Sequence, residues 1–350
     1  MEITILEKLQ NADSGPLIVA ELSGNHGGDL DKALKLVESA VDAGADAIKL
    51  QTYKPETITV NSKDDRFLIK KGLWTGKYLH DLYSMAMTPW EWHRPLAEKA
   101  KELGSVLFSS PFDETAVGFL EKTIEPILYK VASFELNHFP LLEEIGKTGR
   151  PVLASVGVSS LVEIERAVDV LLNSGSPLVC LLHCVSEYPA EPDSFNLSSI
   201  KILRTKFGMP VGLSDHSRGC TVAVVATSMG ARVIEKHFTL DRNEDSIDGE
   251  FSMLPHEFAQ MVEQVKIAHA AIGSVGYYQN EKSAPGAFFK RSILVSRPVQ
   301  KDEVFTEENL RIARPGDGLC PSLWTEVLGS RASANFEVGY PLTVQDFKKV

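Results

Sequence analysis

The chain has 350 residues, of which 43% are hydrophobic and 24% are charged, and its formal net charge is −11. This length suffices for one large α/β domain with an ample core and for a small second module. The negative charge argues against nucleic acid or an anionic membrane as the main partner, so an anionic substrate would require local cations.

The sequence also lacks membrane and secretory features. No apolar run reaches the roughly 18 residues of a membrane span, and the first residues do not resemble a signal peptide. The four cysteines show no metal or redox spacing. We therefore expect a cytoplasmic protein with reduced thiols and no membrane partner.

Short apolar runs alternate with amphipathic segments along most of the chain. Near-continuous apolar runs are typical of strands buried on both faces, and their alternation with helices indicates a parallel sheet. The runs are 17–22, 45–50, 105–110, 127–132, 151–155, 178–183, 210–213 and 231–235. Segments predicted to be helical include 30–43, 91–103, 114–122, 161–173 and 256–272.

Eight strand–helix units in roughly 250 residues are the expectation for a (β/α)8 TIM barrel. A doubly wound open sheet is the alternative, but no Gly-x-Gly-x-x-Gly follows the first strand to support it. One repeat is about twice as long as the others because of an extra stretch over 52–88, which leaves the carboxyl end of the second strand. We expect an active-face loop there that selects substrate, with peripheral decoration as the alternative.

A second boundary lies near 280–286, a polar stretch that contains Gly and Pro. Beyond it the barrel rhythm is lost, and short strands at 292–296 and 310–313 with a helical turn at 322–328 indicate a compact β-rich module. The sequence therefore predicts a barrel domain over 1–280, a linker over 281–288 and a small β-rich domain over 289–350. So small a domain would be marginally stable alone, so we expect it to dock on the barrel or on a second subunit.

Two histidines stand at the ends of two consecutive predicted strands, His216 and His237. A parallel barrel would bring both imidazoles to the same rim, where two nitrogens can hold a divalent metal and leave positions open for substrate. The alternative is that each histidine only caps its strand or satisfies a core hydrogen bond.

Two lysines lie inside otherwise apolar strands, Lys49 and Lys130. A buried ammonium group is costly unless it faces an anion or a carboxylate. Serines stand at neighbouring strand ends, so ammonium and hydroxyl donors together would cradle a phosphate or carboxylate. The alternative is a pair of internal Lys–Glu ion pairs.

Together these groups predict a reaction type. A metal that polarises a carbonyl beside an anion cradle suits condensation of a phosphoenol with an aldehyde. Glu21 and Glu235 are placed to handle the proton of a water or hydroxyl. The residues alone do not separate this chemistry from a metal-dependent aldolase, and a metal hydrolase or a non-catalytic sugar-binding protein are further alternatives.

The chain resembles the sialic acid synthase family over nearly its full length. The motifs that carry the resemblance are AELSGNHG at 20–27, IKLQTY at 48–53, SSPFD at 109–113, YKVAS at 129–133, LHCVSEYP at 182–189, GLSDH at 212–216 and IEKHFT at 234–239. KRSI at 290–293 and RPGDG at 314–318 resemble the antifreeze-like (SAF) domain of that family. Four segments are similar to its pseudaminic acid synthase branch: 51–59, 72–76, 88–93 and 110–117. Val156 and Val185 depart from the family pattern, which commonly has Thr at both positions.

The resemblance implies that phosphoenolpyruvate condenses with an acetamido-sugar aldehyde, which in the pseudaminate branch is 2,4-diacetamido-2,4,6-trideoxy-L-altrose; N-acetylneuraminate or legionaminate synthesis is the alternative. It implies Mn2+ or Mg2+ on His216 and His237, with Glu21, Glu235 and His237 as the catalytic set. The phosphoenolpyruvate site would comprise Lys49, Gln51, Ser110, Lys130, Ser133, Ser155 and Ser214. Tyr188, Asp248 and Arg314 would contact the sugar, and Arg314 would do so in the partner subunit of a domain-swapped homodimer.

Overall fold

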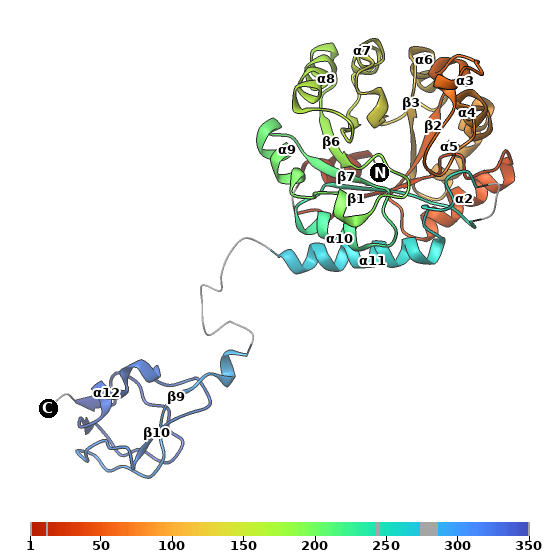
Figure 1. The fold of residues 1–350 in the computed structure, drawn as a ribbon. Coiled ribbons are helices and arrows are strands. Elements are labelled where there is room, and N and C mark those ends of the chain that lie inside the picture. Colours follow the sequence, from red (N-terminus) through yellow and green to blue (C-terminus); the bar gives the residue numbers. More distant parts are fainter. Residues whose placement is uncertain (1, 12, 243–245, 274–285, 349–350) are drawn as a thin grey trace. The chain divides into compact units, whose positions relative to one another are not determined.

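The computed structural model describes residues 2–11, 13–242, 246–273 and 286–348. The chain divides into two compact units, Met1–Gly273 and Ser274–Val350, and each is described by itself (Figure 1). Residues 281–285 of the predicted linker lie outside the described residues, while the end of it enters a short 3-10 turn, η6 (Ala287–Phe289). The boundaries at 280 and 289 therefore stay predictions.

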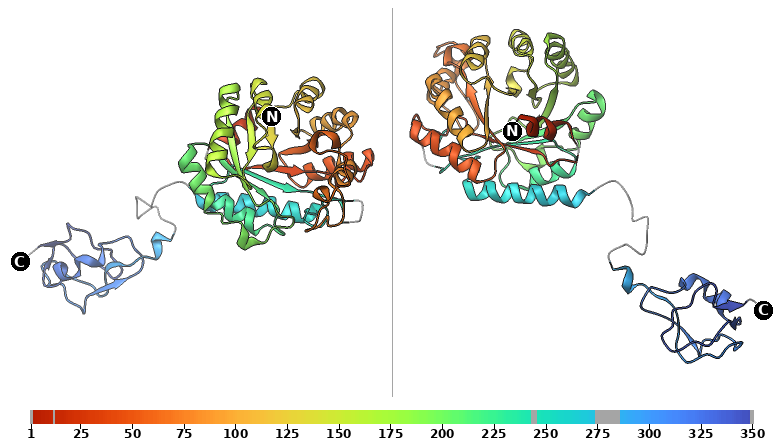
Figure 2. Two further views of the ribbon diagram at one scale, coloured as in Figure 1. Left: turned by 45° about the horizontal axis from the view of Figure 1, so that its top comes forward. Right: turned by 180° about the vertical axis from the view of Figure 1, so that it is seen from behind.

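The first unit is a closed barrel of eight parallel strands in sequential order, and Figures 1 and 2 show helices around it. This closure confirms the predicted (β/α)8 TIM barrel and excludes the open sheet. The strands are β1 (Leu17–Glu21), β2 (Ala47–Thr52), β3 (Val106–Pro111), β4 (Tyr129–Val131), β5 (Val152–Ser155), β6 (Val179–Cys184), β7 (Val211–Asp215) and β8 (Val233–His237).

Side-chain caps mark the starts of several helices of this unit. Asp29 and Asp113 cap α2 and α6 through their side chains, and Ser160 with Glu163 forms a capping box at α8. None of the helices in the described part of the chain is long and apolar enough to cross a membrane. The helices are α1 (Glu2–Gln10), α2 (Leu30–Asp42), α3 (Pro55–Ile58), α4 (Leu79–Ala86), α5 (His93–Glu102), α6 (Glu114–Thr123), α7 (Phe139–Lys147), α8 (Leu161–Ser174), α9 (Ser199–Phe207), α10 (Thr221–Ser228) and α11 (Pro255–Ile272).

The inside of the barrel changes from apolar to polar along each strand. Side chains two residues apart lie on the same face of a strand. A residue two positions after an apolar side chain of the interior therefore also faces inward. An apolar layer forms the lower interior, comprising Leu17, Val19, Ala47, Phe108, Leu128, Leu153, Cys180, Leu182 and Val233. Two residues further on stand polar or charged side chains, among them Glu21, Lys49, Ser110, Lys130, Ser155 and Glu235. The alternation of side chains along the strands thus places the candidate site directly above the apolar layer of the barrel interior.

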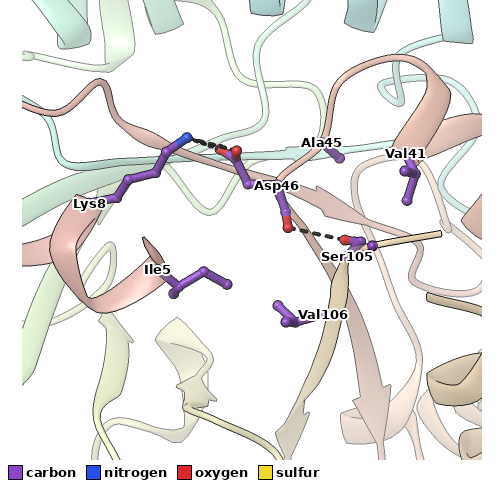
Figure 3. Close-up of a pocket in the computed structure, with 8 residues that line it drawn as sticks. Ile5, Lys8, Val41, Ala45, Asp46, Ser105 and Val106 are labelled. Carbon is purple, nitrogen blue, oxygen red and sulfur yellow. Dashed lines mark hydrogen bonds and ion pairs between the residues drawn. The ribbon is translucent and has the colours of Figure 1, made fainter. Parts of the chain in front are cut away.

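Helix α1 closes the opposite end of the barrel. Ile5 and Leu9 join the apolar layer of the interior and are almost fully buried. Beside them lies a hollow of about 190 Å³, where both carboxylate oxygens of Asp46 accept from Lys8 at 2.7 Å (Figure 3). Asp46 also accepts a hydrogen bond from the backbone N–H of Ile18 at 2.8 Å. The Asp46 carboxylate is therefore paired with Lys8 and joins α1 to the amino-terminal end of the barrel.

The second unit is small and built around its own apolar cluster. Two antiparallel pairs form it, β9 (Ser292–Val295) with β10 (Leu310–Ala313), and β11 (Arg331–Ala332) with β12 (Phe347–Lys348). A single turn of helix, α12 (Trp324–Val327), covers one side of a core that contains Ile293, Val299, Phe305 and Leu342. The β-rich module predicted from the sequence is therefore present.

Candidate active site at the carboxyl end of the barrel

Thirteen of the fourteen candidate site residues lie on the barrel unit, at or just beyond the carboxyl ends of its strands. Glu21, Lys49 and Lys130 end or follow the apolar part of β1, β2 and β4, while Glu235 and His237 share the inner face of β8. The exception is Arg314, which is exposed and belongs to the second unit, so each unit is considered on its own.

A cluster of two ammonium and two carboxylate groups occupies the centre. Lys49 Nζ pairs directly with Glu21 and lies 3.5 Å from Glu235 Oε1, and Lys130 Nζ lies 3.8 Å from the same oxygen. All four side chains are buried. Lys49 therefore forms an internal ion pair with a glutamate, which was the alternative to an anion cradle in the sequence analysis. Lys130 is different, because its carboxylate neighbour lies beyond hydrogen-bond distance and its ammonium donates to the Val131 carbonyl at 3.1 Å.

Burial and charge move the pKa values of these groups apart. Burial raises the pKa of Glu21 more than the ion pair with Lys49 lowers it. Burial also acts on Glu235, but Lys130 and Lys49 outweigh it and hold the pKa of that carboxyl below its usual range. Burial lowers the pKa of Lys130 despite the attraction of Glu235. Two carboxylates with opposite shifts are the pattern expected of an acid and a base that share one site.

Serine hydroxyls surround the two ammonium groups. Ser110 lies on β3 beside Gln51 of β2, and Ser155 lies on β5 beyond the pair formed by Lys130 and Leu153. The hydroxyl oxygens of Ser110 and Ser155 are buried without a hydrogen-bond partner. Unpartnered buried donors are costly, so these two are positioned to bind an oxygen-rich ligand.

Two further serines have partners already. Ser214 donates to Glu235 Oε1 at 2.9 Å, and the Ser133 hydroxyl accepts from the Val158 backbone at 3.2 Å. Ser214 therefore orients the central carboxylate, and Ser133 ties the loop after β4 to the loop after β5.

The two histidines lie side by side. The ring centroids of His216 and His237 are 5.4 Å apart. Nδ1 of His216 donates to the Val185 carbonyl at 2.7 Å, which leaves Nε2 with its lone pair, while Nδ1 of His237 is buried without a hydrogen-bond partner. A backbone carbonyl makes this contact, so the Val185 departure from the family pattern costs His216 no support.

These imidazoles fit a divalent cation. Burial lowers the pKa of His216 to about 4, and burial, with smaller contributions from His216 and Lys49, holds the pKa of His237 well below its usual range. Both rings are therefore neutral near pH 7, as metal ligands must be. Within the described ranges, no cluster of three or more His, Cys, Asp or Glu is arranged as a metal site.

A third group of side chains flanks the histidines. Asp248 Oδ2 lies 3.8 Å from His237 Nδ1 and accepts from the Ser23 hydroxyl, which in turn accepts from Gln51 Nε2 at 3.1 Å. The Tyr188 ring packs against the His216 ring in a tilted arrangement, with the ring centroids 4.5 Å apart. Burial raises the pKa of Asp248 to about 6.

Three neighbouring residues were not assigned a role from the sequence. Ser23 links Asp248 to Gln51, and its φ of 46° places it in the left-handed region. Asn25 accepts from the Asp248 backbone at 3.0 Å. Burial raises the pKa of Glu135 to about 7, and its Oε2 is buried without a hydrogen-bond partner. The AELSGNHG motif contains Ser23 and Asn25, and Glu135 lies in the 3-10 turn η3 (Ser133–Glu135) that follows β4, so their positions close to strand ends were the signal in the sequence.

A fully buried ion pair supports the histidines from behind. Asp215 and Lys236 are register partners on β7 and β8, and Lys236 Nζ donates to Asp215 Oδ2 at 2.9 Å. Each precedes one of the two histidines in sequence, so the pair fixes the relative height of His216 and His237.

Replacing Lys236 by Met would leave the Asp215 carboxylate buried without its cation. We expect Lys236→Met to lower the free energy of unfolding by about 3–5 kcal/mol, because an uncompensated buried charge costs that much. Lys63→Met is the matched control, since the Lys63–Asp81 pair is exposed and should contribute about 1 kcal/mol or less. Urea denaturation of both variants measures the difference, and equal losses would contradict a special role for the buried pair.

Family models match both units of the chain. The NeuB family model matches residues 36–277, and the SAF domain model matches residues 290–348. The chain belongs to the NeuB family. The SAF match coincides with the small β-rich unit, as the sequence motifs at 290–293 and 314–318 predicted.

Individual relatives of the NeuB family align over nearly the whole chain. Pseudaminic acid synthase from Campylobacter jejuni is 42% identical over 97% of this chain and 98% of its own length. N,N'-diacetyllegionaminic acid synthase from the same species is 33% identical over 92% and 97%. A crystal structure of N-acetylneuraminic acid synthetase from Leptospira borgpetersenii in complex with citrate superposes with a TM-score of 0.69 at 33% identity, covering 77% of this chain and 90% of that one.

Proposed function

We propose that this protein is a pseudaminic acid synthase, which condenses phosphoenolpyruvate with 2,4-diacetamido-2,4,6-trideoxy-L-altrose to give pseudaminic acid and phosphate. The observation that carries the proposal is that two buried ammonium groups with unpartnered serine hydroxyls share one rim with two adjacent neutral imidazoles. The identity of 42% to a pseudaminic acid synthase, against 33% to a legionaminic acid synthase, favours this acceptor over the alternatives.

Phosphoenolpyruvate binds in the cradle of ammonium and hydroxyl donors. Lys130 retains donor capacity toward a ligand, and the hydroxyls of Ser110 and Ser155 complete the set of charge-assisted and neutral hydrogen bonds. Lys49, Gln51, Ser133 and Ser214 border this subsite. The carboxylates of the subsite do not exclude an anion, because Glu235 lies near the ammonium groups of both lysines and Glu21 is paired with Lys49.

The acceptor aldehyde lies beside the two histidines. His216 and His237 would hold Mn2+ or Mg2+, which polarises a carbonyl oxygen when it is bound. Asp248 accepts hydrogen bonds from sugar hydroxyls, and the Tyr188 ring packs against the sugar. In this proposal the aldehyde carbon lies next to the enol carbon of phosphoenolpyruvate.

The reaction then proceeds in three bond changes. C3 of phosphoenolpyruvate attacks the aldehyde carbon, a carbon–carbon bond forms, and the aldehyde oxygen takes up a proton. Positive charge at C2 is captured by water, which gives up a proton to the site. The resulting tetrahedral centre expels phosphate when the bond between C2 and the bridging oxygen breaks, and the new hydroxyl group on C2 passes its proton to the departing phosphate, which leaves a 2-keto acid.

The two glutamates divide the proton traffic. We assign Glu21, whose pKa is raised by burial, as the group that protonates the developing alkoxide, and Glu235, whose pKa is held low by the two lysines, as the group that accepts a proton from water. The ionised Glu235 also stabilises positive charge at C2 through space. His237 completes the catalytic set.

Phosphate release tests the proposal and its alternatives together. We expect release only when phosphoenolpyruvate and the diacetamido-altrose are both present, and loss of release after chelation, because each half of the rim binds one substrate. Turnover without phosphoenolpyruvate would instead indicate a hydrolase, and no turnover with any aminosugar aldehyde would indicate a sugar-binding protein.

Labelled bridging oxygen in phosphoenolpyruvate tests the mechanism in the same assay. Cleavage between C2 and that oxygen sends the label into phosphate, which mass spectrometry detects. Label that stays with the keto acid would contradict the sequence of steps.

We also propose a domain-swapped homodimer in which Arg314 of the partner subunit closes each site. A bidentate guanidinium is suited to a sugar amide or hydroxyl. Exposed apolar side chains surround the ends of β4 and β5, which is typical of a covered surface; they are Phe134, Phe139, Val158, Leu161 and Val162. The hydrogen bond from Val158 to Ser133 joins this surface to the phosphoenolpyruvate subsite.

Mixed dimers test whether Arg314 acts across subunits. Arg314→Ala and His237→Ala should each be inactive alone, yet after unfolding and refolding together they should recover about a quarter of wild-type activity. Half of the random dimers are mixed, and in each mixed dimer one of two sites combines an intact barrel with an intact Arg314. Refolded wild-type protein is the control, and a mixture without activity would contradict action in trans.

A further inference from the structure

The inserted segment after β2 brings one aromatic side chain against the sugar side of the candidate site. From this contact we propose that Trp74 is a specificity-determining residue, which selects acceptor sugars that end in a methyl group over those that end in a hydroxymethyl group. The inference rests on the proposed condensation with an acetamido-sugar and adds which feature of that sugar is read.

Trp74 extends a continuous aromatic wall beside the metal ligands. Its ring lies 5.5 Å from the Tyr188 ring, and Tyr188 lies 5.1 Å from Phe251. Phe251 in turn lies 4.8 Å from His237, and Tyr188 lies 4.5 Å from His216. The wall therefore runs from the two imidazoles outward to the inserted segment.

A hydrogen bond fixes the indole in this position. Trp74 Nε1 donates to the Ile247 carbonyl at 3.2 Å, and Ile247 directly precedes Asp248. The indole is therefore anchored to the same loop that carries the proposed hydroxyl acceptor. Because its N–H is already used, Trp74 offers an incoming sugar an apolar ring face.

The proposed sugar site has a polar side and an aromatic side. Asp248, Ser23 and Gln51 supply polar contacts on one side, and Trp74, Tyr188 and Phe251 supply ring faces on the other. A terminal methyl group packs on aromatic faces and loses nothing on leaving water. A terminal hydroxyl facing Trp74 gives up hydrogen bonds to water that the ring does not replace.

Steady-state kinetics with two acceptors tests the proposal. The acceptors are 2,4-diacetamido-2,4,6-trideoxy-L-altrose and the same sugar with its terminal hydroxyl restored, and the readout is the ratio of their kcat/KM values. We expect wild-type protein to favour the deoxy sugar roughly a hundredfold and Trp74→Leu to lower this ratio about tenfold, as for other apolar contacts to one small group. Trp74→Phe, which keeps a ring, should stay within about threefold of wild type, and KM for phosphoenolpyruvate should not change.

Trp90→Leu is the matched control. Trp90 belongs to η2 (Trp90–Trp92), donates its N–H to the Tyr53 carbonyl at 3.1 Å, and packs on Phe119 with ring centroids 4.4 Å apart. The Trp90→Leu variant therefore loses the same kind of hydrogen bond as Trp74→Leu, but Trp90 is not part of the aromatic wall. Its ratio of kcat/KM values for the two acceptors should equal that of wild type.

Two results would overturn the inference while the proposed function stands. One is a Trp74→Leu protein that loses activity with both sugars equally, which would make Trp74 an anchor of the loop only. The other is a wild-type protein whose bound deoxy sugar shows no saturation transfer to its terminal methyl in NMR, a measurement that needs no variant to fold. A wild-type protein that releases no phosphate with either sugar would overturn the proposed function, and this inference with it.

Discussion

The Glu235 carboxylate lies between two buried ammonium groups, and the rest of the site depends on this arrangement. Lys49 and Lys130 stand on apolar strands, where an ammonium group without an anion would be too costly to keep. Glu235 reduces that cost without satisfying Lys130 by a hydrogen bond, since their separation is 3.8 Å. Lys130 thereby keeps donor capacity for an anionic ligand in a chain whose net charge is −11.

The two ends of the barrel interior differ in composition: one is apolar and the other carries the polar cluster. The lower interior is an apolar layer that Ile5 and Leu9 of α1 join, whereas the groups proposed to bind substrate lie at the carboxyl ends of the strands. The upper interior keeps the unpartnered oxygens of Ser110 and Ser155 and the unpartnered nitrogen of His237. Such unsatisfied groups weaken a core but are what a binding site requires.

Much of the fold and the rim could be predicted from the sequence, because parallel strands bring their carboxyl ends together. That rule alone was enough to expect His216 beside His237, and Lys49 and Lys130 in one interior. Strand ends were less accurate: β2 begins at Ala47 rather than residue 45, since the Asp46 side chain is used to cap Ile18 and pair with Lys8.

Other features needed three dimensions. Helix α10 (Thr221–Ser228) has no charged residue, so no polar face marks it as a surface helix. The carboxylate partners of Lys49 come from β1 and β8, which are distant in sequence, so an ion pair and an anion site could not be told apart. The contact of Trp74 with Tyr188 joins an inserted loop to the end of β6, and no periodicity predicts such a contact.

The central claim is that the imidazole pair and the ammonium cradle hold their ligands next to each other. Magnetic resonance of the Mn2+-loaded protein with phosphoenolpyruvate measures this directly. The Mn2+ spectrum should show coupling to two imidazole nitrogens, and the phosphorus resonance of bound phosphoenolpyruvate should be strongly broadened by the nearby metal. A bound phosphorus signal that keeps its width, or a metal without imidazole nitrogens, would contradict the account.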